Sequence, residues 1–308
     1  MMYIITKNTI IQNKSIRMKI IVPTNNKGGV GKTKVSMILA EYFSYVKKVK
    51  TLAIDFDPQC NLSRRFIKME LDPSSPQGYY PPLHPDYNPN DPEDDLWDGR
   101  SSIANIFFGK AVIPYPTFIE NLDIAPAHAD QLLLAEAVRR TEVIEKVHKQ
   151  LHKFLSCPEV EKEYKIIIVD TAPSKGPLTI SAIEASTHII IPSVMEAQPI
   201  QGIYGMMQLW MQESLKREAG REINLIGILP NIFRQNNLHK DMLESLKNNS
   251  KISKYVMPVV LGQRIAFAEV DVDGALPRSI FDLPDSDLAK QEAIKMCEFV
   301  EKRVFENE

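Results

Sequence analysis

The sequence predicts an α/β protein with a mostly parallel, twisted sheet of about seven or eight strands and helices on both faces. Short apolar runs rich in β-branched residues alternate along the chain with longer amphipathic stretches, which is typical of a parallel sheet covered on both sides. A glycine-rich loop also follows the first apolar run and opens the first helical pattern. This junction of strand, loop and helix favours the same class of fold.

The expected elements follow from the period of the apolar positions. Apolar residues at helical spacing predict one helix from the glycine-rich loop to residue 46. Further helices are expected over 129–154, 199–218, 238–248 and 286–305. Strands are expected over 19–23, 51–55, 122–125, 165–170, 188–192, 223–229 and 255–259.

Composition excludes several classes of protein. The 308 residues are 44% hydrophobic and 25% charged, with 13 Gly and 21 Pro, so neither a fibrous nor a disordered chain is indicated. The formal charge of −2 gives no global attraction to nucleic acid or anionic lipid. Three widely spaced cysteines argue against a disulfide framework and against a metal site within one chain.

Two segments stand apart from the rest of the chain. Residues 1–17 lie before the first strand pattern and are treated as an N-terminal extension. Residues 70–99 hold seven prolines and eight acidic residues with no Lys or Arg, which predicts a surface insertion rather than part of a sheet. It is either a tolerated acidic loop or, through its aromatic residues, a loop that docks a partner. The remainder of 18–308 is expected to form a single domain.

The glycine-rich loop is the strongest functional motif. It reads Thr24-Asn25-Asn26-Lys27-Gly28-Gly29-Val30-Gly31-Lys32-Thr33. Backbone N–H groups of such a loop and the following helix N-terminus surround phosphate, Lys32 can reach the β and γ phosphates, and the Thr33 hydroxyl can bind Mg²⁺. Asn26 occupies the position of the first glycine in the usual pattern, and a second lysine, Lys27, stands beside it.

The loop from Lys27 to Thr33 resembles the deviant Walker A loop of the ParA/MinD family of P-loop ATPases. The resemblance covers about residues 18 to 300 and implies ATP and Mg²⁺ as cofactors and ATP hydrolysis as the activity. It also implies a sandwich homodimer, formed on ATP binding, in which Lys27 reaches the partner's nucleotide and acts with Lys32 in catalysis. The nucleotide contacts that it implies in the loop are Lys27, Gly28, Gly29, Val30, Gly31, Lys32, Thr33 and Lys34.

Two acidic motifs fit the same family. The run Asp55-Phe56-Asp57-Pro58-Gln59-Cys60-Asn61 resembles its D-x-D-P-Q-x-N motif, which implies that Asp57 positions the attacking water and contacts the metal, with Asp55 in support. Four apolar residues precede Asp170, as in a Walker B strand, so Asp170 is expected in the magnesium shell together with Thr33. Standing alone, this run would equally suit a buried strand that ends in a capping Asp.

A later motif suggests where the base is bound. Gly227-Ile228-Leu229-Pro230-Asn231 follows a strand where members of the family bind adenine, which makes Pro230 and Asn231 candidate base contacts. In contrast, His148 and His152 share one helical face without a third ligand, so a solvated pair is favoured over a metal site.

The distribution of charged residues indicates whether the protein would bind DNA or a membrane. Residues 213–264 carry nine basic and five acidic side chains, which suits either salt-sensitive, sequence-independent DNA binding or solvated helix faces. Arg234 and Arg264 lie near the family's DNA-binding positions but not in register with them. The chain ends with four Glu against one Lys and one Arg after residue 297, which argues against a membrane-binding helix.

The sequence is therefore interpreted as a ParA-type ATPase that partitions plasmid, mobile-element or chromosomal DNA. Its expected partners are a second copy of the chain, non-specific DNA and a ParB-like centromere-binding protein, with no membrane, and its expected place is the cytoplasm, on the nucleoid. One alternative is a related ATPase that positions a protein cargo such as a secretion or conjugation apparatus. Another is a nucleotide-gated binding protein or repressor with little turnover.

Overall fold

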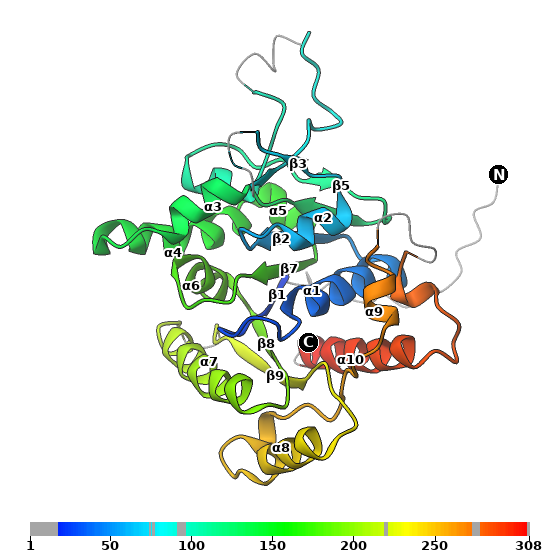
Figure 1. Ribbon diagram of the computed structural model, residues 1–308. Helices are drawn as coiled ribbons and strands as arrows, with labels where there is room; N and C mark the ends of the chain where they lie inside the picture. The colour runs from blue at the N-terminus through cyan, green and yellow to red at the C-terminus, as the bar shows by residue number, and fades with distance from the viewer. Residues whose placement is uncertain are drawn as a thin grey trace, which may run out of the picture.

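A seven-stranded, mostly parallel sheet forms the centre of the protein (Figure 1). The structure is a computed structural model and describes residues 18–73, 75, 78–90, 97–218, 221–272 and 278–306. The strand order is β5-β6-β2-β7-β1-β8-β9, and only the pair β5–β6 is antiparallel. The strands are β1 (Lys19–Pro23), β2 (Thr51–Phe56), β5 (Tyr115–Pro116), β6 (Leu122–Ala125), β7 (Ile166–Thr171), β8 (His188–Ser193) and β9 (Asn224–Pro230).

Helices cover both faces of this sheet, as the apolar strands require. Every residue of β2, β7 and β8 is buried, and alternate residues of each strand enter opposite cores. Ile20 and Val22 belong to one core, whereas Ile21 belongs to the other. The first core is closed by α3 (Ala129–Glu136), α4 (Thr141–Leu155), α5 (Pro158–Glu163), α6 (Pro177–Ala185), α7 (Ala197–Leu215) and α8 (Asn237–Asn248).

The opposite core lies under helices from the two ends of the described chain. It packs against α1 (Lys32–Glu41), which continues into a π-helical turn (Tyr42–Val46), and against α2 (Asn61–Phe66), α9 (Ala266–Glu269) and α10 (Leu288–Phe305). Figure 1 places α1, α9 and α10 on the right of the sheet and α4, α6 and α7 on the left. The sheet is thus the middle of three layers, and the predicted fold class is confirmed.

Two expected elements differ in the structure. The strand expected over 255–259 was wrong: a 3₁₀ turn (Ser253–Tyr255) is followed by one isolated bridge between Val256 and Ile228, and Pro258 has no N–H to extend a ladder. The helix expected over 129–154 is two helices, because α3 ends at Glu136. The Glu136 carboxylate accepts hydrogen bonds from Ser174 Oγ and from the N–H of Leu178, which hold this end against α6.

The acidic, proline-rich segment lies beside the main sheet, near β5 and at the top of Figure 1. It was not expected to contribute sheet structure, and this was wrong in one respect. Two short strands, β3 (Glu70–Leu71) and β4 (Tyr79–Tyr80), pair with each other in an antiparallel ladder outside the main sheet. Residues 74, 76–77 and 91–96 of this segment, and the N-terminal extension 1–17, lie outside the described residues.

No helix in the described parts of the chain has the length and apolar character needed to cross a membrane.

Candidate nucleotide-binding site

Four segments that carry the sequence motifs meet at one edge of the sheet. The glycine-rich loop follows β1, Asp57 follows β2, Asp170 lies near the end of β7, and Asn231 follows β9. Strands β2, β7 and β1 are adjacent and parallel, so their carboxyl ends lie side by side. Ligands in open α/β folds bind at this edge of the sheet.

The backbone of the loop requires glycine at two positions. Gly29 and Gly31 have φ values of +71° and +81°. Residues other than glycine rarely adopt such positive φ values. A Cβ built on Gly28 or Gly29 would meet no atom within 4 Å, so this stretch is open to an approaching group. In contrast, a Cβ on Gly31 would lie 2.3 Å from Nδ2 of Asn231. The loop therefore combines an open rim with a tightly packed base.

Lys32 points into the loop rather than into solvent. Its side chain is buried, and Nζ donates a hydrogen bond to the carbonyl oxygen of Lys27 over 3.2 Å. Burial lowers the pKa of Lys32, whereas the charges of Asp170 and Asp57 raise it. The ammonium group thus lies between the loop backbone and two carboxylates, where a phosphate could replace the carbonyl as its partner.

Lys27 is half-buried at the head of the loop, beside α7. Its N–H donates to Oδ1 of Asn25 over 3.1 Å, and Asn25 Nδ2 donates to the carbonyl of Pro192 over 2.9 Å. A Cβ built on Gly202 of α7 would lie only 2.9 Å from Cγ of Lys27. No carboxylate in the described ranges forms a salt bridge with the Lys27 ammonium group.

The next two residues of the loop differ in how they face the site. Thr33 is half-buried and interacts through its side chain with Asp170. Lys34 turns the other way, because its ammonium group bonds to the carboxylate of Asp271 and donates to the carbonyl of Phe267 over 2.5 Å. The Lys34 side chain is therefore directed toward α9 and not toward Asp170.

Asp55 and Asp57 occupy different environments. Asp55 is fully buried, and its Oδ2 accepts bonds from the N–H and the hydroxyl of Ser63, at 2.8 and 2.7 Å. Its Oδ1 accepts from the N–H of Asp57 over 3.2 Å. Asp57 is 6% exposed, and burial raises its pKa against the influence of Gln59 and Lys32. Asp55 thus braces the turn that presents Asp57.

Asp170 is buried opposite Asp55 on the neighbouring strand, since the two residues are register partners of β7 and β2. Burial raises the pKa of both carboxyls, and each is raised further by a nearby carboxylate. Oδ1 of Asp170 accepts a hydrogen bond from Ser36 over 3.0 Å, whereas Oδ2 is buried without a hydrogen-bond partner among the described residues. An unpartnered, buried carboxylate oxygen beside a threonine hydroxyl fits the oxygen ligands that Mg²⁺ prefers.

Pro230 and Asn231 lie at the end of β9, against the base of the loop. Asn231 is buried, and its Nδ2 donates to the carbonyl of Val30 over 2.8 Å. The side-chain amide that we expected to contact adenine therefore bonds to the loop backbone. Pro230 is the last residue of β9, and its carbonyl accepts a hydrogen bond from the N–H of Leu261.

Sequence reasoning missed three residues of this site: Asn25, Ser36 and Ser63. Ser36 lies one helical turn after Lys32, a spacing that places it on the same side of α1 and that was available as a signal. Ser63 joins Asp55 to the segment that leads into α3, because its hydroxyl also accepts from the N–H of Ala127 over 2.9 Å. This contact joins segments that are far apart in the sequence, so no local pattern could have predicted it.

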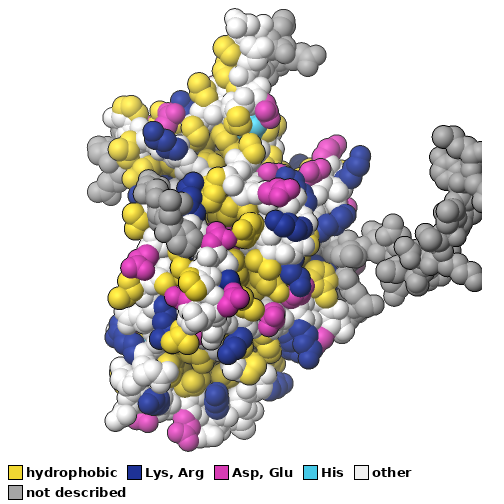
Figure 2. Space-filling model, turned by 90° about the vertical axis from the view of Figure 1, so that its right-hand side faces the viewer, with side chains coloured by type: hydrophobic (Ala, Val, Ile, Leu, Met, Phe, Trp, Pro, Cys, Tyr) yellow, Lys and Arg dark blue, Asp and Glu magenta, His cyan; other side chains and the backbone are white. Residues whose placement is uncertain are grey.

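The basic residues between 213 and 264 do not form one uniform set. Arg264 pairs with Glu292 over 2.6 Å, and Arg234 donates to Gln263 over 2.8 Å. Lys240, Lys247 and Lys251 are exposed and form no salt bridge within the described residues. On the face shown in Figure 2, Lys and Arg side chains are spread over the upper and the lower half, interspersed with acidic residues.

His148 and His152 lie on α4, where the sequence favoured a solvated pair over a metal site. Within the described residues, no group of three or more His, Cys, Asp or Glu side chains could hold a metal ion. Burial lowers the pKa of His148, which favours its neutral form in the folded protein.

The family is shown by comparison with known proteins. A family model described as an AAA domain matches residues 18–224. The chain is 28% identical to the sporulation initiation inhibitor protein Soj of Bacillus subtilis over 78% of this chain and 84% of that protein. It is 23% identical to the virulence plasmid ParA family protein pGP5-D of Chlamydia psittaci over 94% of this chain and 97% of that protein.

Solved structures show the same fold. A complex of Cyanothece McdA with ATP has a TM-score of 0.68 at 17% identity, and the match covers 92% of this chain and 97% of that one. Cobyrinic acid a,c-diamide synthase from Mycobacterium smegmatis, with a bound ATP analogue and magnesium, has a TM-score of 0.59 at 20% identity, with 82% and 93% covered. Together with the loop and the carboxylates around it, these findings establish that the chain belongs to the ParA/MinD family of P-loop ATPases and is most like the ParA partition proteins.

Proposed function

We propose that this protein is an ATP-driven partition ATPase that dimerises around ATP, binds DNA without sequence preference and is stimulated to hydrolyse ATP by a ParB-like, centromere-binding protein. One observation carries the proposal. A buried lysine and two buried carboxylates meet at the glycine-rich loop, while a second lysine stands at the head of the loop with no carboxylate partner among the described residues. Membership of the family and the ParA-type relatives support the same activity.

The first step is capture of the triphosphate by the loop. The open rim at Gly28 and Gly29 gives the phosphates access to backbone N–H groups, and the N-terminus of α1 adds partial positive charge. Lys32 exchanges the carbonyl of Lys27 for the β and γ phosphate oxygens. This exchange breaks the hydrogen bond between Lys32 and the carbonyl of Lys27. Lys27, the residue proposed to act across the dimer, is then held less tightly.

Lys27 is proposed to act on the nucleotide of the partner subunit. Its ammonium group has no ion-pair partner in the described chain, so no salt bridge has to be broken before it meets a phosphate. A cation placed against the γ phosphate stabilises the charge that develops during transfer, as an arginine finger does. ATP then joins the two subunits, and its hydrolysis removes the charge that Lys27 binds.

Asp57 is proposed to orient the attacking water. The bond from its N–H to Asp55, and the bond from the N–H of Gln59 to its Oδ1 at 2.9 Å, fix the direction of its carboxylate. A fixed carboxylate beside the γ phosphate holds the water in line, and catalysis of phosphoryl transfer depends mainly on such positioning.

Thr33 and Asp170 are proposed to hold Mg²⁺, with Asp57 near enough to contact its shell. The ion, when bound, would offset the negative charge of the phosphates. The unpartnered Oδ2 of Asp170 and the raised pKa of this carboxyl fit a site that is destabilised when empty. Ser36 holds the other oxygen of Asp170 and so fixes the carboxylate for this task.

DNA binding is proposed for the exposed face of α8. Lys240 and Lys247 are two helical turns apart on this face, and Lys251 lies just beyond the end of the helix; these three residues are called the lysine stripe. Buried His239, Leu243 and Leu246 mark the core-facing side of α8, about a quarter turn around the helix from Lys240 and Lys247. Two copies of the stripe in a dimer would contact several phosphates and release counterions, which makes binding dependent on salt but not on sequence.

The test is retention on non-specific DNA. The purified protein, passed over an immobilised duplex at low salt, is expected to stay bound with ATP and to elute with ADP or as the salt concentration rises. Lys32→Ala serves as the control that cannot use ATP. Failure to retain the wild-type protein at low salt with ATP would remove DNA from the proposal, and equal ATP turnover by wild type and Asp57→Ala would remove the catalytic assignment.

A further inference from the structure

A second cavity lies outside the ATP site. It has a volume of about 620 Å³ and is lined by residues of the acidic insertion, of the 3₁₀ turn at Ile103–Phe107 and of the start of α3. None of the glycine-rich loop, Asp57, Asp170 or Asn231 contributes to it. Pockets of about 300 to 1,000 Å³ with aromatic walls and a few polar groups are typical of small-molecule sites.

The walls of this insertion pocket are aromatic and held in place. Trp97 donates from Nε1 to the carbonyl of Arg100 over 2.9 Å and packs against Tyr87 and His84. On the other side, the guanidinium of Arg100 stacks on Tyr80 at 4.6 Å. Arg100 also forms a salt bridge with Glu70 at 3.0 Å. The charge of Arg100 therefore stabilises the wall and is not available to a ligand.

Two polar atoms behind the pocket wall have no hydrogen-bond partner among the described residues. Nδ1 of His128 and Oε1 of Gln131 are buried and form no hydrogen bond with any described residue. His128 is the N-cap residue of α3, but its side chain does not cap the helix, and burial lowers its pKa. Both atoms are shielded from solvent, so a ligand in the cavity does not reach them unless the wall shifts.

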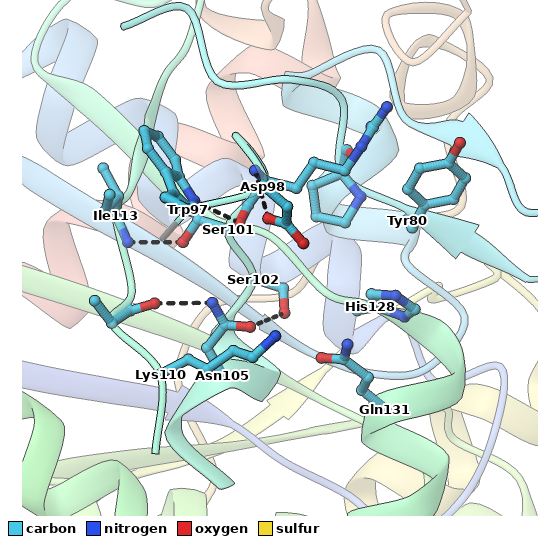
Figure 3. Close-up of a pocket in the computed structure, with 13 residues that line it drawn as sticks. Tyr80, Trp97, Asp98, Ser101, Ser102, Asn105, Lys110, Ile113, His128 and Gln131 are labelled. Carbon is cyan, nitrogen blue, oxygen red and sulfur yellow. Dashed lines mark hydrogen bonds between the residues drawn. The ribbon is translucent and has the colours of Figure 1, made fainter. Parts of the chain in front are cut away.

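Two opposite charges stand at the rim. Figure 3 shows Asp98 above and Lys110 below the cavity, with His128 and Gln131 at its right-hand wall. Lys110 forms no salt bridge within the described parts of the chain, and the exposed carboxylate of Asp98 accepts a hydrogen bond from the N–H of Arg100 at 3.1 Å. One end of the pocket thus favours an anionic group and the other a cationic group.

We propose that the insertion pocket binds a small zwitterion with an apolar body, such as an aromatic amino acid. Its carboxylate would meet Lys110, its ammonium group would meet Asp98, and its ring would lie between Trp97 and Tyr80. This assignment is independent of the partition function, because the pocket shares no lining residue with the ATP site.

Three probes with the same ring separate the contributions of charge. Phenylalanine carries both charges, 3-phenylpropionate only the acid and 2-phenylethylamine only the amine. The chain has two tryptophans, so Trp210→Phe leaves Trp97 as the single reporter, excited at a wavelength that the probes do not absorb. Phenylalanine is expected to bind about tenfold more tightly than either analogue, with saturating ATP present or absent. Calorimetry on the wild-type chain repeats the measurement without the Trp210 substitution.

Variants assign each charge. Lys110→Gln is expected to weaken the binding of phenylalanine and 3-phenylpropionate but not of 2-phenylethylamine. Asp98→Asn is expected to weaken the binding of phenylalanine and 2-phenylethylamine but not of 3-phenylpropionate. The Asn side chain can keep the hydrogen bond from the N–H of Arg100, so this variant removes only the charge. Lys153→Gln, an exposed lysine on α4, is the control and should change nothing. The proposal is overturned if no probe binds at ~10 mM, if all three bind equally, if ATP displaces them, or if neither rim variant changes the order of affinities.

Discussion

Asn231 reaches from the end of β9 to the glycine-rich loop, where its Nδ2 donates a hydrogen bond to the backbone carbonyl of Val30 over 2.8 Å. The two residues are 201 positions apart in the sequence. This bond fixes the loop against the far side of the sheet, and the same amide nitrogen fills the space next to Gly31. The backbone of the glycine-rich loop is therefore held by a contact outside the loop itself.

Gly31→Ala is expected to damage this contact. The new methyl would lie 2.3 Å from Asn231 Nδ2 on a backbone with φ +81°, and a strained position of this kind costs about 1–3 kcal/mol. Thermal unfolding should show the loss of stability, and a fluorescent ATP analogue should show weaker binding. Gly28→Ala is the matched control, because its Cβ meets no atom within 4 Å. Equal unfolding temperatures for the two variants would contradict the role assigned to Asn231.

Lys27→Ala is expected to separate nucleotide binding from dimerisation. Lys32 and the loop backbone remain, so the variant should bind ATP, whereas the cation proposed to cross to the partner's phosphates is gone. Light scattering after size exclusion, with ATP and with ADP, measures the mass of the particle. Lys110→Ala, an exposed lysine far from the loop in sequence, should dimerise normally. An ATP-dependent dimer of Lys27→Ala would disprove the action across subunits.

Asp170→Asn is expected to make the nucleotide-free protein more stable and to abolish turnover. Burial is the main cause of the raised pKa of Asp170, so a neutral side chain removes the cost of a buried charge and can keep the bond from Ser36. A gain of about 1 kcal/mol would raise the unfolding temperature by about 1–2 °C in a protein of this size. The variant is expected to lose ATP hydrolysis while it gains stability, because an active-site carboxylate is kept for activity at the expense of stability. A less stable variant would refute the assignment.

The gain from Asp170→Asn is expected to grow with pH. The folded protein holds the proton of Asp170 at pH values where the unfolded chain, with a pKa of about 3.9, has lost it. The contribution of Asp170 to the free energy of unfolding of the wild type therefore falls as the pH rises from about 4 to above the raised pKa of the folded protein. Asn does not titrate, so the difference in the free energy of unfolding between variant and wild type should increase from about pH 5 to about pH 8. Urea titrations at both pH values measure it, and a difference independent of pH would contradict the raised pKa.

The sequence predicted most of the sheet because each central strand is a continuous apolar run with both faces buried. Local motifs likewise predicted Lys32, Asp57 and Asp170 as neighbours, since they lie at or just beyond the carboxyl ends of adjacent parallel strands. Contacts set by packing could not be predicted in this way. The bond from Asn231 to Val30 and the bracing of Asp55 by Ser63 join distant segments. The apolar residues at 255–259 looked like a strand, but Pro258 and the preceding 3₁₀ turn prevent one.

The last prediction concerns the lysine stripe of α8. Changing Lys240, Lys247 and Lys251 together to Gln removes three exposed charges from each subunit, and so twice as many from a dimer. Because each phosphate contact contributes about −0.9 to the slope of log affinity against log salt, the affinity for non-specific duplex DNA should fall and its salt dependence should flatten.

Lys146, Lys149 and Lys153 form a matched set of exposed lysines on α4, and the same three substitutions there should leave DNA binding unchanged. Fluorescence anisotropy with a labelled duplex, with ATP and at several salt concentrations, compares the two triple variants. Both should hydrolyse ATP without DNA at the wild-type rate, since neither set of lysines touches the site. If the α4 variant loses DNA binding and the α8 variant keeps it, then the DNA surface lies at α4 and not at the lysine stripe.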